Sequence, residues 1–294
     1  MSLEPASIAI RALGFICLFQ AAGAAFFLRL FQRHIAAVEQ RIGRVARATA
    51  VGGIGLVIAH QALEAALLRG DVSGLIDPRL QQLAWSSSSG NAALLEILAL
   101  AIVVLGLRRP GRDGAIIAST GAAVAVCAFA LTGHTSASGY RGLLAPLLIV
   151  HLLAIAFWFG ALLPLSLMLR SAPRTDTVAL LREFSALAGV LVPLIALAGL
   201  TLALTLIHPT RAWRAPYGLL ILLKIALFSA LMGLAAWNRW RLLPRLGARA
   251  AAPEALPAGS RTAAVALRGS IAAEYVMIVI VFAVTASLTA LFSP

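Results

Sequence analysis

The sequence predicts an all-α integral membrane protein, a bundle of eight transmembrane helices, and three observations support this prediction. Hydrophobic residues occupy 61% of the 294 positions and charged residues only 12%, whereas soluble proteins are about half apolar and about a quarter charged. The apolar residues gather in eight stretches, each near the ~20 residues needed to cross a ~30 Å hydrocarbon core. Because no period-2 pattern appears, these stretches must satisfy their backbone polar groups as helices.

Polar and turn-forming segments separate these stretches and justify each span in order. Arginines in 29–47 separate the first two spans, and segment 69–90 separates the second from the third. This second segment ends in Ser-Ser-Ser-Ser-Gly, which favours turn and cap conformations. Basic segments follow at 108–112 and 170–182. The eight spans are expected at 7–28, 48–68, 91–107, 114–133, 143–169, 184–207, 217–238 and 272–291.

Residues 1–294 are expected to form a single transmembrane domain. Segment 245–268 contains a run of Ala, Pro, Gly and Ser that is typical of a flexible linker. We expect this linker to be cytoplasmic and to separate the last span from the others. The first residues lack the basic region of a signal peptide, so 7–28 is expected to be a retained span. Both cysteines fall inside spans, so no disulfide framework is expected.

The basic residues lie in alternate loops, which predicts the orientation of the chain. Seventeen of the 24 Lys and Arg residues lie in 29–47, 108–112, 170–182 and 239–268, and the opposite loops hold five. Arginine-rich loops stay on the cytoplasmic side, so eight spans place both termini in the periplasm. The net charge of +13 then encodes orientation. We therefore expect a lipid bilayer as partner and no nucleic acid.

Four of the five histidines fall in or beside the outer halves of the predicted spans. His60 and His151 each lie eight residues from the outer end of a span, which is roughly 12 Å deep at ~1.5 Å per residue. His134 and His208 lie at the outer ends of two other spans. His34 lies in a cytoplasmic loop and is set aside. The pattern predicts an outer vestibule and a deeper layer of histidines on the periplasmic side.

Two further side chains extend this candidate site. Glu64 follows His60 by four residues, which places both on one face of a helix. Cys127 precedes His134 by seven residues, and helical spacing again predicts a shared face. Imidazole suits both copper and zinc, and thiolate favours Cu(I). The candidate metal ligands are therefore His60, His134, His151, His208, Glu64 and Cys127.

Structural roles for the same residues remain open at this stage. An intramembrane histidine often serves only as a hydrogen-bond partner between helices, and Cys127 also suits a small packing residue. Arg11, Glu96 and Lys224 lie in outer halves of spans, where we expect buried ion pairs. Glu274 lies near the inner end of the last predicted span, and we expect it to pair with Arg268.

Three stretches in and after the fourth span carry a family resemblance. The first is Thr132-Gly-His134 with the segment 151–165, which contains Trp158-Phe-Gly160. The second is Leu181-Arg-Glu-Phe-Ser185, and the third is 216–228 followed by 236–246. In combination they are similar to the CopD family of bacterial copper-resistance and copper-uptake membrane proteins. The resemblance covers spans 4 to 7, and the first half matches mainly in its hydropathy and layout.

The resemblance implies a multi-pass protein of the bacterial inner membrane that takes copper, as Cu(I) or Cu(II), from the periplasm. It also implies a separate periplasmic copper carrier similar to CopC as a partner. By matching motifs, the resemblance extends to His134, His151 and Lys224. His60, Glu64 and His208 rest on the topology alone.

Three functions follow as hypotheses. In the first, copper is captured at the vestibule, passed to His60 and His151, and released into the cytoplasm. In the second, the same two histidines ligate haem b, as bis-imidazole binding requires two histidines at equal depth. In the third, the protein is a copper-binding assembly factor without transport. The chain has no Walker motif and no Cys-Pro-Cys of an ATP-driven pump, so we predict no enzymatic activity.

Overall fold

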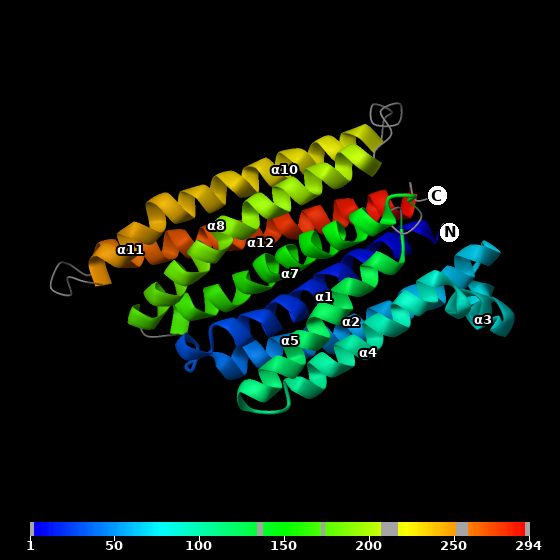
Figure 1. Cartoon of the computed structure of the whole chain (residues 1–294), viewed down its shortest axis with the longest axis horizontal. Helices are drawn as coiled ribbons and strands as arrows, with labels where there is room; N and C mark the ends of the chain where they lie inside the picture. Colours follow the sequence, from blue (N-terminus) through cyan, green and yellow to red (C-terminus); the bar gives the residue numbers. More distant parts are fainter. Residues whose placement is uncertain (1–2, 134–137, 172–173, 207–216, 251–257, 292–294) are drawn as a thin grey trace.

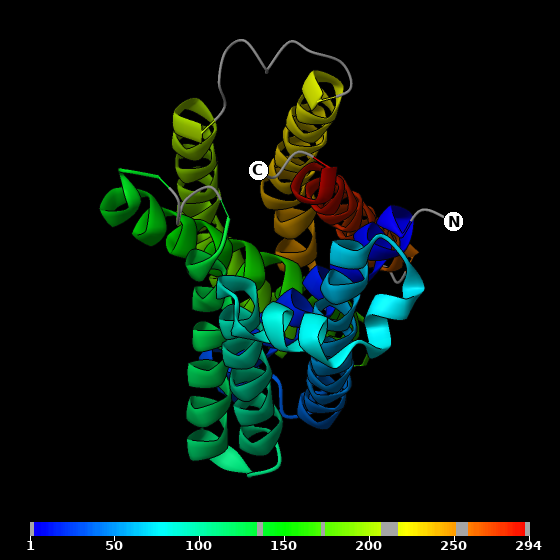
Figure 2. The same cartoon turned by 90° about the vertical axis from the view of Figure 1, so that its right-hand side faces the viewer.

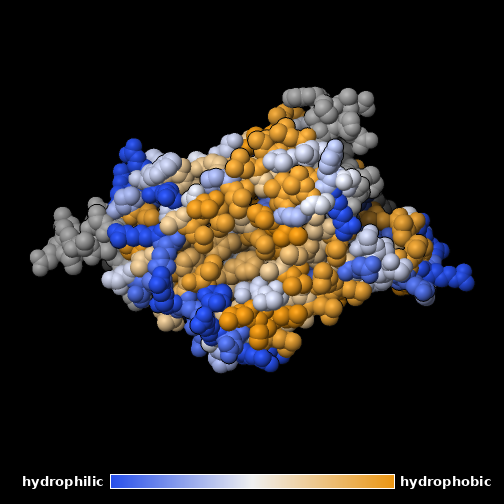
Figure 3. All heavy atoms as spheres, in the orientation of Figure 1, coloured by the Kyte–Doolittle hydropathy of each residue, from blue (hydrophilic) through white to orange (hydrophobic). Residues whose placement is uncertain are grey.

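The computed structural model describes residues 3–133, 138–171, 174–206, 217–250 and 258–291 (Figure 1). The described residues form helices and no strand. Eight of these helices are long and apolar enough to cross a membrane. The predicted all-α membrane bundle is therefore confirmed. Figure 3 shows hydrophobic side chains across the middle of one face and hydrophilic ones gathered toward its ends, as contact with a bilayer requires.

The membrane-crossing helices are joined by short connections, single helical turns and two short helices. They are α1 (Glu4–Leu30), α2 (Glu39–Arg69), α4 (Ser88–Gly106), α5 (Gly111–Cys127), α7 (Arg141–Ser171), α8 (Arg174–Leu206), α10 (Tyr217–Trp237) and α12 (Ala258–Leu291). Between them lie the 3₁₀ turns η1 (Gln32–His34), η2 (Val72–Ile76) and η3 (Ala128–Leu131), the short helix α3 (Pro78–Ser86), the π-helical turn η4 (Asn238–Leu242) and α11 (Leu243–Ala250).

Several helices extend beyond the apolar stretches that predicted them. α2 begins at Glu39 rather than 48, and α12 begins at Ala258 rather than 272. Once a helix is nucleated, each added residue gains a hydrogen bond, so the helices continue into the polar zone outside the hydrocarbon core. The predicted linker 245–268 consequently contains the end of α11 and the start of α12. Residues 251–257 lie outside the described residues.

α1 lies at the centre of the bundle, where it packs against α2, α5, α7 and α12. Figures 1 and 2 show α2, α4 and α5 on one side of this central helix and α8 and α10 beyond α7 and α12 on the other. Small residues make the crossing of α1 and α7 close. A Cβ atom on Gly23 would overlap the Ala156 carbonyl oxygen, and one on Gly160 would overlap the Gly23 backbone. Close backbone approach of this kind stabilises helix pairs in lipid.

Both chain termini lie at the same end of the bundle, together with α3 (Figure 1). We call this the termini end. The opposite end, which contains η1, the connection from α4 to α5, and α11, is called the arginine-rich end. This arrangement agrees with an even number of spans. That the termini end faces the periplasm stays a prediction from the charge pattern.

Candidate metal centre

His60 and Glu64 lie together near the termini end of α2. His60 Nε2 is 3.6 Å from Glu64 Oε1, one helical turn away. Each side chain is about three-quarters covered, since His60 is 21% and Glu64 28% exposed. The Nδ1 atom of His60 is buried, and no hydrogen-bond partner for it occurs in the described part of the chain. His60 therefore has one ring nitrogen, Nε2, near a carboxylate and a second, Nδ1, without a partner among the described residues.

The start of α4 holds a hydroxyl group over this pair. Ser89 Oγ donates a hydrogen bond to Glu64 Oε1 at 2.9 Å and lies 3.3 Å from Gln61 Oε1. Gln61 is 1% exposed, and its Nε2 donates to the Ala84 carbonyl oxygen of α3 at 2.7 Å. Ser87 caps α4 by accepting from the backbone N–H of Gly90. The run of serines that predicted a turn thus also orients Glu64.

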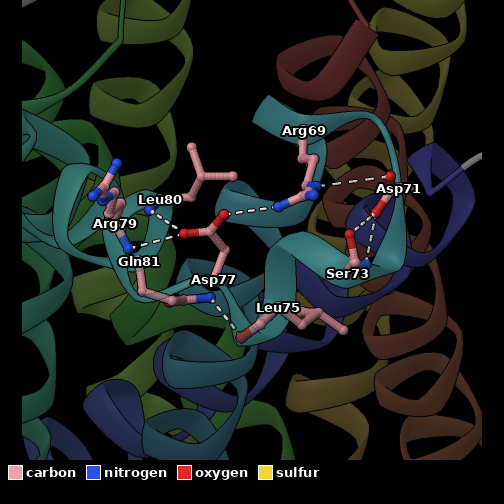
Figure 4. Close-up of polar contacts among 8 residues, drawn as sticks. All are labelled: Arg69, Asp71, Ser73, Leu75, Asp77, Arg79, Leu80 and Gln81. Atoms are coloured by element: carbon pink, nitrogen blue, oxygen red, sulfur yellow. Dashed lines mark hydrogen bonds and ion pairs between the residues drawn. The ribbon is translucent and has the colours of Figure 1, made fainter.

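The corner formed by η2 and α3, which connects α2 to α4, is stabilised by acidic residues (Figure 4). Asp77 accepts hydrogen bonds from the backbone N–H groups of Arg79 and Leu80, and its Oδ2 lies 2.7 Å from Arg69 Nη1. Asp71 accepts from the backbone and the hydroxyl of Ser73. These hydrogen bonds hold the pKa of Asp71 below its usual value. The acids of this corner are thus occupied by capping and ion pairing, and they position α3 rather than a metal.

One more ionisable side chain lies within electrostatic range of the pair, and it also links the pair to Glu96 of α4. Arg11 of α1 interacts with Glu64 and Glu96, and it also interacts with His60. Its guanidinium carbon lies 6.0 Å from the centre of the Phe15 ring. Among the described residues, Arg11 makes no ion pair within 4.0 Å. The contact pairs expected for Arg11 and Glu96 are therefore replaced by longer-range interactions.

His151 of α7 has a different set of neighbours, which come from α8 and α10. Its Nδ1 is 3.0 Å from the carbonyl oxygen of Ile195. A carbonyl can only accept, so Nδ1 carries the proton and Nε2 keeps its lone pair for a metal. The ring lies against Gly199, where an added Cβ would be 2.9 Å from His151 Cε1. Lys224 of α10 interacts electrostatically with His151, and no ion pair of Lys224 occurs in the described ranges.

The structure gives His60 and His151 different neighbours, although both lie toward the termini end. α1 packs between the helices that carry them, α2 and α7. Within the described residues, no group of three or more His, Cys, Asp and Glu side chains is close enough to hold one metal ion. His134 and His208 lie outside the described residues. Hence the structure brings His60 and Glu64 together and leaves His151 apart from them.

The expected shared face of Cys127 and His134 requires a correction. Cys127 ends α5 and is half-buried as a free thiol. The chain continues as η3 to Leu131, after which Thr132 is extended and Gly133 has a φ of 79°. Left-handed backbone suits glycine and ends the helix, so helical spacing does not reach His134. The Thr132-Gly133 sequence was the signal that would have predicted this break.

Glu274 also differs from its expected role. Because α12 begins at Ala258, Glu274 lies about 24 Å along the helix at ~1.5 Å per residue. It is only 3% exposed. Asn238 Nδ2 donates to Glu274 Oε1 at 2.5 Å, and Trp158 also hydrogen-bonds this carboxyl group. Among the described residues it makes no ion pair with Arg268. Sequence reasoning missed this cluster because the apolar stretch began only at 272.

A contact at the arginine-rich end joins the two halves of the chain. Glu183 Oε1 of α8 lies 2.5 Å from Arg33 Nη2 and 3.1 Å from His34 Nε2 of η1. His34, expected to be a cytoplasmic loop residue, therefore has a structural partner in Glu183. All three side chains lie at the opposite end of the bundle from His60.

Together these features define a multi-pass membrane protein with a histidine–carboxylate pair inside the termini half of the bundle. Comparison with known proteins is consistent with this class. Residues 178–288 match the family of copper resistance protein D, and residues 2–143 match the copper resistance protein D-like N-terminal domain. The chain belongs to the CopD family.

A curated relative gives the same result. Copper resistance protein D of Pseudomonas syringae pv. tomato is 29% identical over 262 residues, which cover 82% of this chain and 83% of the relative. No solved structure matches this chain. The predicted family, derived from three short stretches in spans 4 to 7, is thus confirmed over most of the sequence.

Proposed function

We propose that this protein moves copper ions from the periplasm across the bacterial inner membrane into the cytoplasm. The observation that supports the proposal most is the unpartnered Nδ1 of His60, whose other ring nitrogen, Nε2, lies 3.6 Å from the Glu64 carboxylate inside a membrane bundle of the CopD family. Imidazole nitrogen is a ligand for both Cu(I) and Cu(II). A carboxylate one turn away offsets part of the positive charge of the ion.

The second step of the proposal concerns the order of the sites. His134 and His208 are proposed to receive the ion at the periplasmic entrance, where a separate CopC-like carrier would deliver it. His60 with Glu64 and the Nε2 atom of His151 then serve as two separate stations. Their different neighbours support two stations better than one shared ion. The same separation weighs against bis-imidazole binding of haem b.

Nearby positive charges suit transport rather than storage. Arg11 acts on His60, and Lys224 acts on His151. Repulsion from a fixed cation raises the energy of a bound copper ion, most strongly where water is excluded. Conduction requires that an ion bind well enough to enter and weakly enough to leave. We therefore propose modest affinity at both stations, with Cys127 as an additional soft ligand near the termini end.

The first prediction tests this function with purified protein in liposomes. Wild type should carry copper into the liposomes, and His60→Ala should reduce the rate by about tenfold or more, since a lost ligand worth ~1.4 kcal/mol changes binding tenfold. His34→Ala provides the matched control, because His34 lies at the arginine-rich end and pairs with Glu183. Copper entry would be followed with a chelator dye inside the liposomes.

The outcomes separate the three candidate functions. Absence of copper flux in wild type, or equal loss of flux in both variants, contradicts transport through the His60 site. A Soret absorption band in the purified protein that disappears in His60→Ala would instead indicate haem b. Copper that binds at His60 without any flux would indicate an assembly factor. Equal expression and size-exclusion profiles of the variants show that folding is not the cause.

A further inference from the structure

A cavity of about 580 Å³ opens in the arginine-rich half of the bundle. It lies between α8 on one side and α10 with η4 on the other, and side chains of α7 and α12 also line it. Most lining residues are apolar, and its polar side chains are few: Ser185, Asn238, Arg239 and Glu274.

The buried carboxyl group of Glu274 has neutral hydrogen-bond partners. Asn238 Nδ2 donates to it at 2.5 Å, and Trp158 hydrogen-bonds it from α7. The other end of the Asn238 amide, its Oδ1, is buried, and the described residues offer it no hydrogen-bond partner. An unused amide oxygen therefore lies beside a buried carboxyl group at the wall of a cavity.

The charged groups nearby do not neutralise Glu274. Arg239 lines the cavity, but its guanidinium donates to the Ser185 carbonyl oxygen. No ion pair of Glu274 is present within the described ranges. The helices packed against α12 are α1, α7, α10, η4 and α11. Among the described side chains, the titratable and charged groups that these elements and α12 itself bring to this half are Cys17, Arg29, Arg170, Arg239, Arg241, Arg245, Arg268 and Tyr275.

An ionised carboxylate without a cation is costly inside a membrane protein. Glu274 must therefore hold either a proton or a bound cation. Its carboxylate and the free Asn238 oxygen offer oxygen ligands, and the thioether of Met232 lines the same cavity. Oxygen ligands bind copper less strongly than sulfur or imidazole, which suits a site of release.

Asn238 occupies a special place in its helix. It begins η4, a single π-helical turn between α10 and α11. Such turns insert one residue into a helix and occur frequently at functional sites. Within this turn Asn238 reaches Glu274 of α12, and Leu242 is buried, whereas Trp240 lines the cavity and is largely exposed.

We propose that Glu274 and Asn238 form a further cation site, at which a proton on Glu274 is exchanged for the passing copper ion. This inference rests on the proposed transport function. In the exchange the carboxyl O–H bond breaks, and the proton leaves through the cavity to water at the arginine-rich end. A carboxylate oxygen and Asn238 Oδ1 then bind the ion. When the ion departs, a proton returns, and copper keeps its oxidation state throughout.

Infrared difference spectroscopy on purified protein tests the site independently of transport. Wild type should show the C=O stretching band of a protonated buried carboxyl group, and addition of Cu(I) should remove it. Glu274→Gln should lack the band, whereas Glu183→Gln should retain it, because Glu183 is ionised in its pair with Arg33. Asn238→Ala should keep the band but require about tenfold more copper to remove it, as expected for loss of one ligand worth ~1.4 kcal/mol.

Each outcome either supports or overturns the exchange site. A band that is absent from wild type, persists in Glu274→Gln, or is insensitive to copper overturns it. Proton release on binding gives a second readout: in weakly buffered solution, Cu(I) bound by purified wild type should release a proton from Glu274, and Glu274→Gln should release none. If wild type carries no copper, the transport proposal fails, while the infrared result still decides whether copper displaces the proton of Glu274.

Discussion

At the scale of single residues, the candidate centre depends on one local pair and one distant hydroxyl. His60 and Glu64 meet because helical spacing of four residues places them on the same face. Ser89, 25 residues further along the chain, orients the carboxylate by donating to Glu64 Oε1. In metal sites, partners of this kind hold the ligand in position and tune its affinity.

This geometry predicts a modest effect of Ser89→Ala. Loss of the hydroxyl should weaken copper binding by roughly 2- to 10-fold, because a neutral hydrogen bond contributes about 0.5–1.5 kcal/mol. Ser119→Ala is the matched control, since Ser119 on α5 donates only to the Ile116 carbonyl oxygen of its own helix. Copper titration of the purified variants would measure the change. Equal affinity in both would contradict the positioning role of Ser89.

At the scale of elements, the crossing of α1 and α7 sets the geometry of the bundle. Gly23 and Gly160 allow the two backbones to touch. Near this crossing, Gln20 donates from Nε2 to the Gly160 carbonyl oxygen at 3.1 Å. Aromatic rings then fill the adjacent space, with Phe19 stacked on Phe129 of η3 and Phe282 of α12 at 5.7 Å and 5.1 Å. This packing fixes the positions of α7, η3 and α12 against α1.

Replacement of Gly23 tests the crossing. Gly23→Ala should lower the free energy of unfolding by about 1–3 kcal/mol, the usual cost of added volume in a packed interface. Gly14→Ala on the same helix is the control, because a Cβ there meets no atom within 4 Å. Alanine is about 1 kcal/mol more favourable than glycine in a helix, so this variant should be at least as stable as wild type. Thermal unfolding midpoints in detergent would compare them.

At the scale of the whole molecule, the two halves of the chain contribute different features. The first half supplies His60 and Glu64 on one side of α1, and the second half supplies His151 on the other. The contact of Arg33 and His34 with Glu183 ties the halves together at the arginine-rich end. The exchange site proposed at Glu274 lies closer to the arginine-rich end than His60 and His151 do. A path across the membrane would therefore run from the termini end to the arginine-rich end.

The orientation of this path is open to a direct test. The distribution of arginines predicts that both termini face the periplasm. Alkaline phosphatase fused to the C-terminus should therefore be active in cells, whereas green fluorescent protein at the same position should stay dark. Fusions to the connection between α4 and α5 should give the reverse result. Fluorescence of C-terminal fusions would contradict the predicted orientation. The termini end would then face the cytoplasm, and the proposed direction of copper movement would be reversed.

The sequence by itself determined the eight membrane helices, the side of each loop relative to the others, and the His60–Glu64 pair. These features are local, because hydropathy, charge and i,i+4 spacing depend only on neighbouring residues. Tertiary structure decided that Ser89 contacts Glu64, that α1 separates His60 from His151, and that Glu274 is buried against Asn238. Depth along a helix follows from residue count, but which helix faces meet depends on close packing between distant segments such as Gly23 and Gly160.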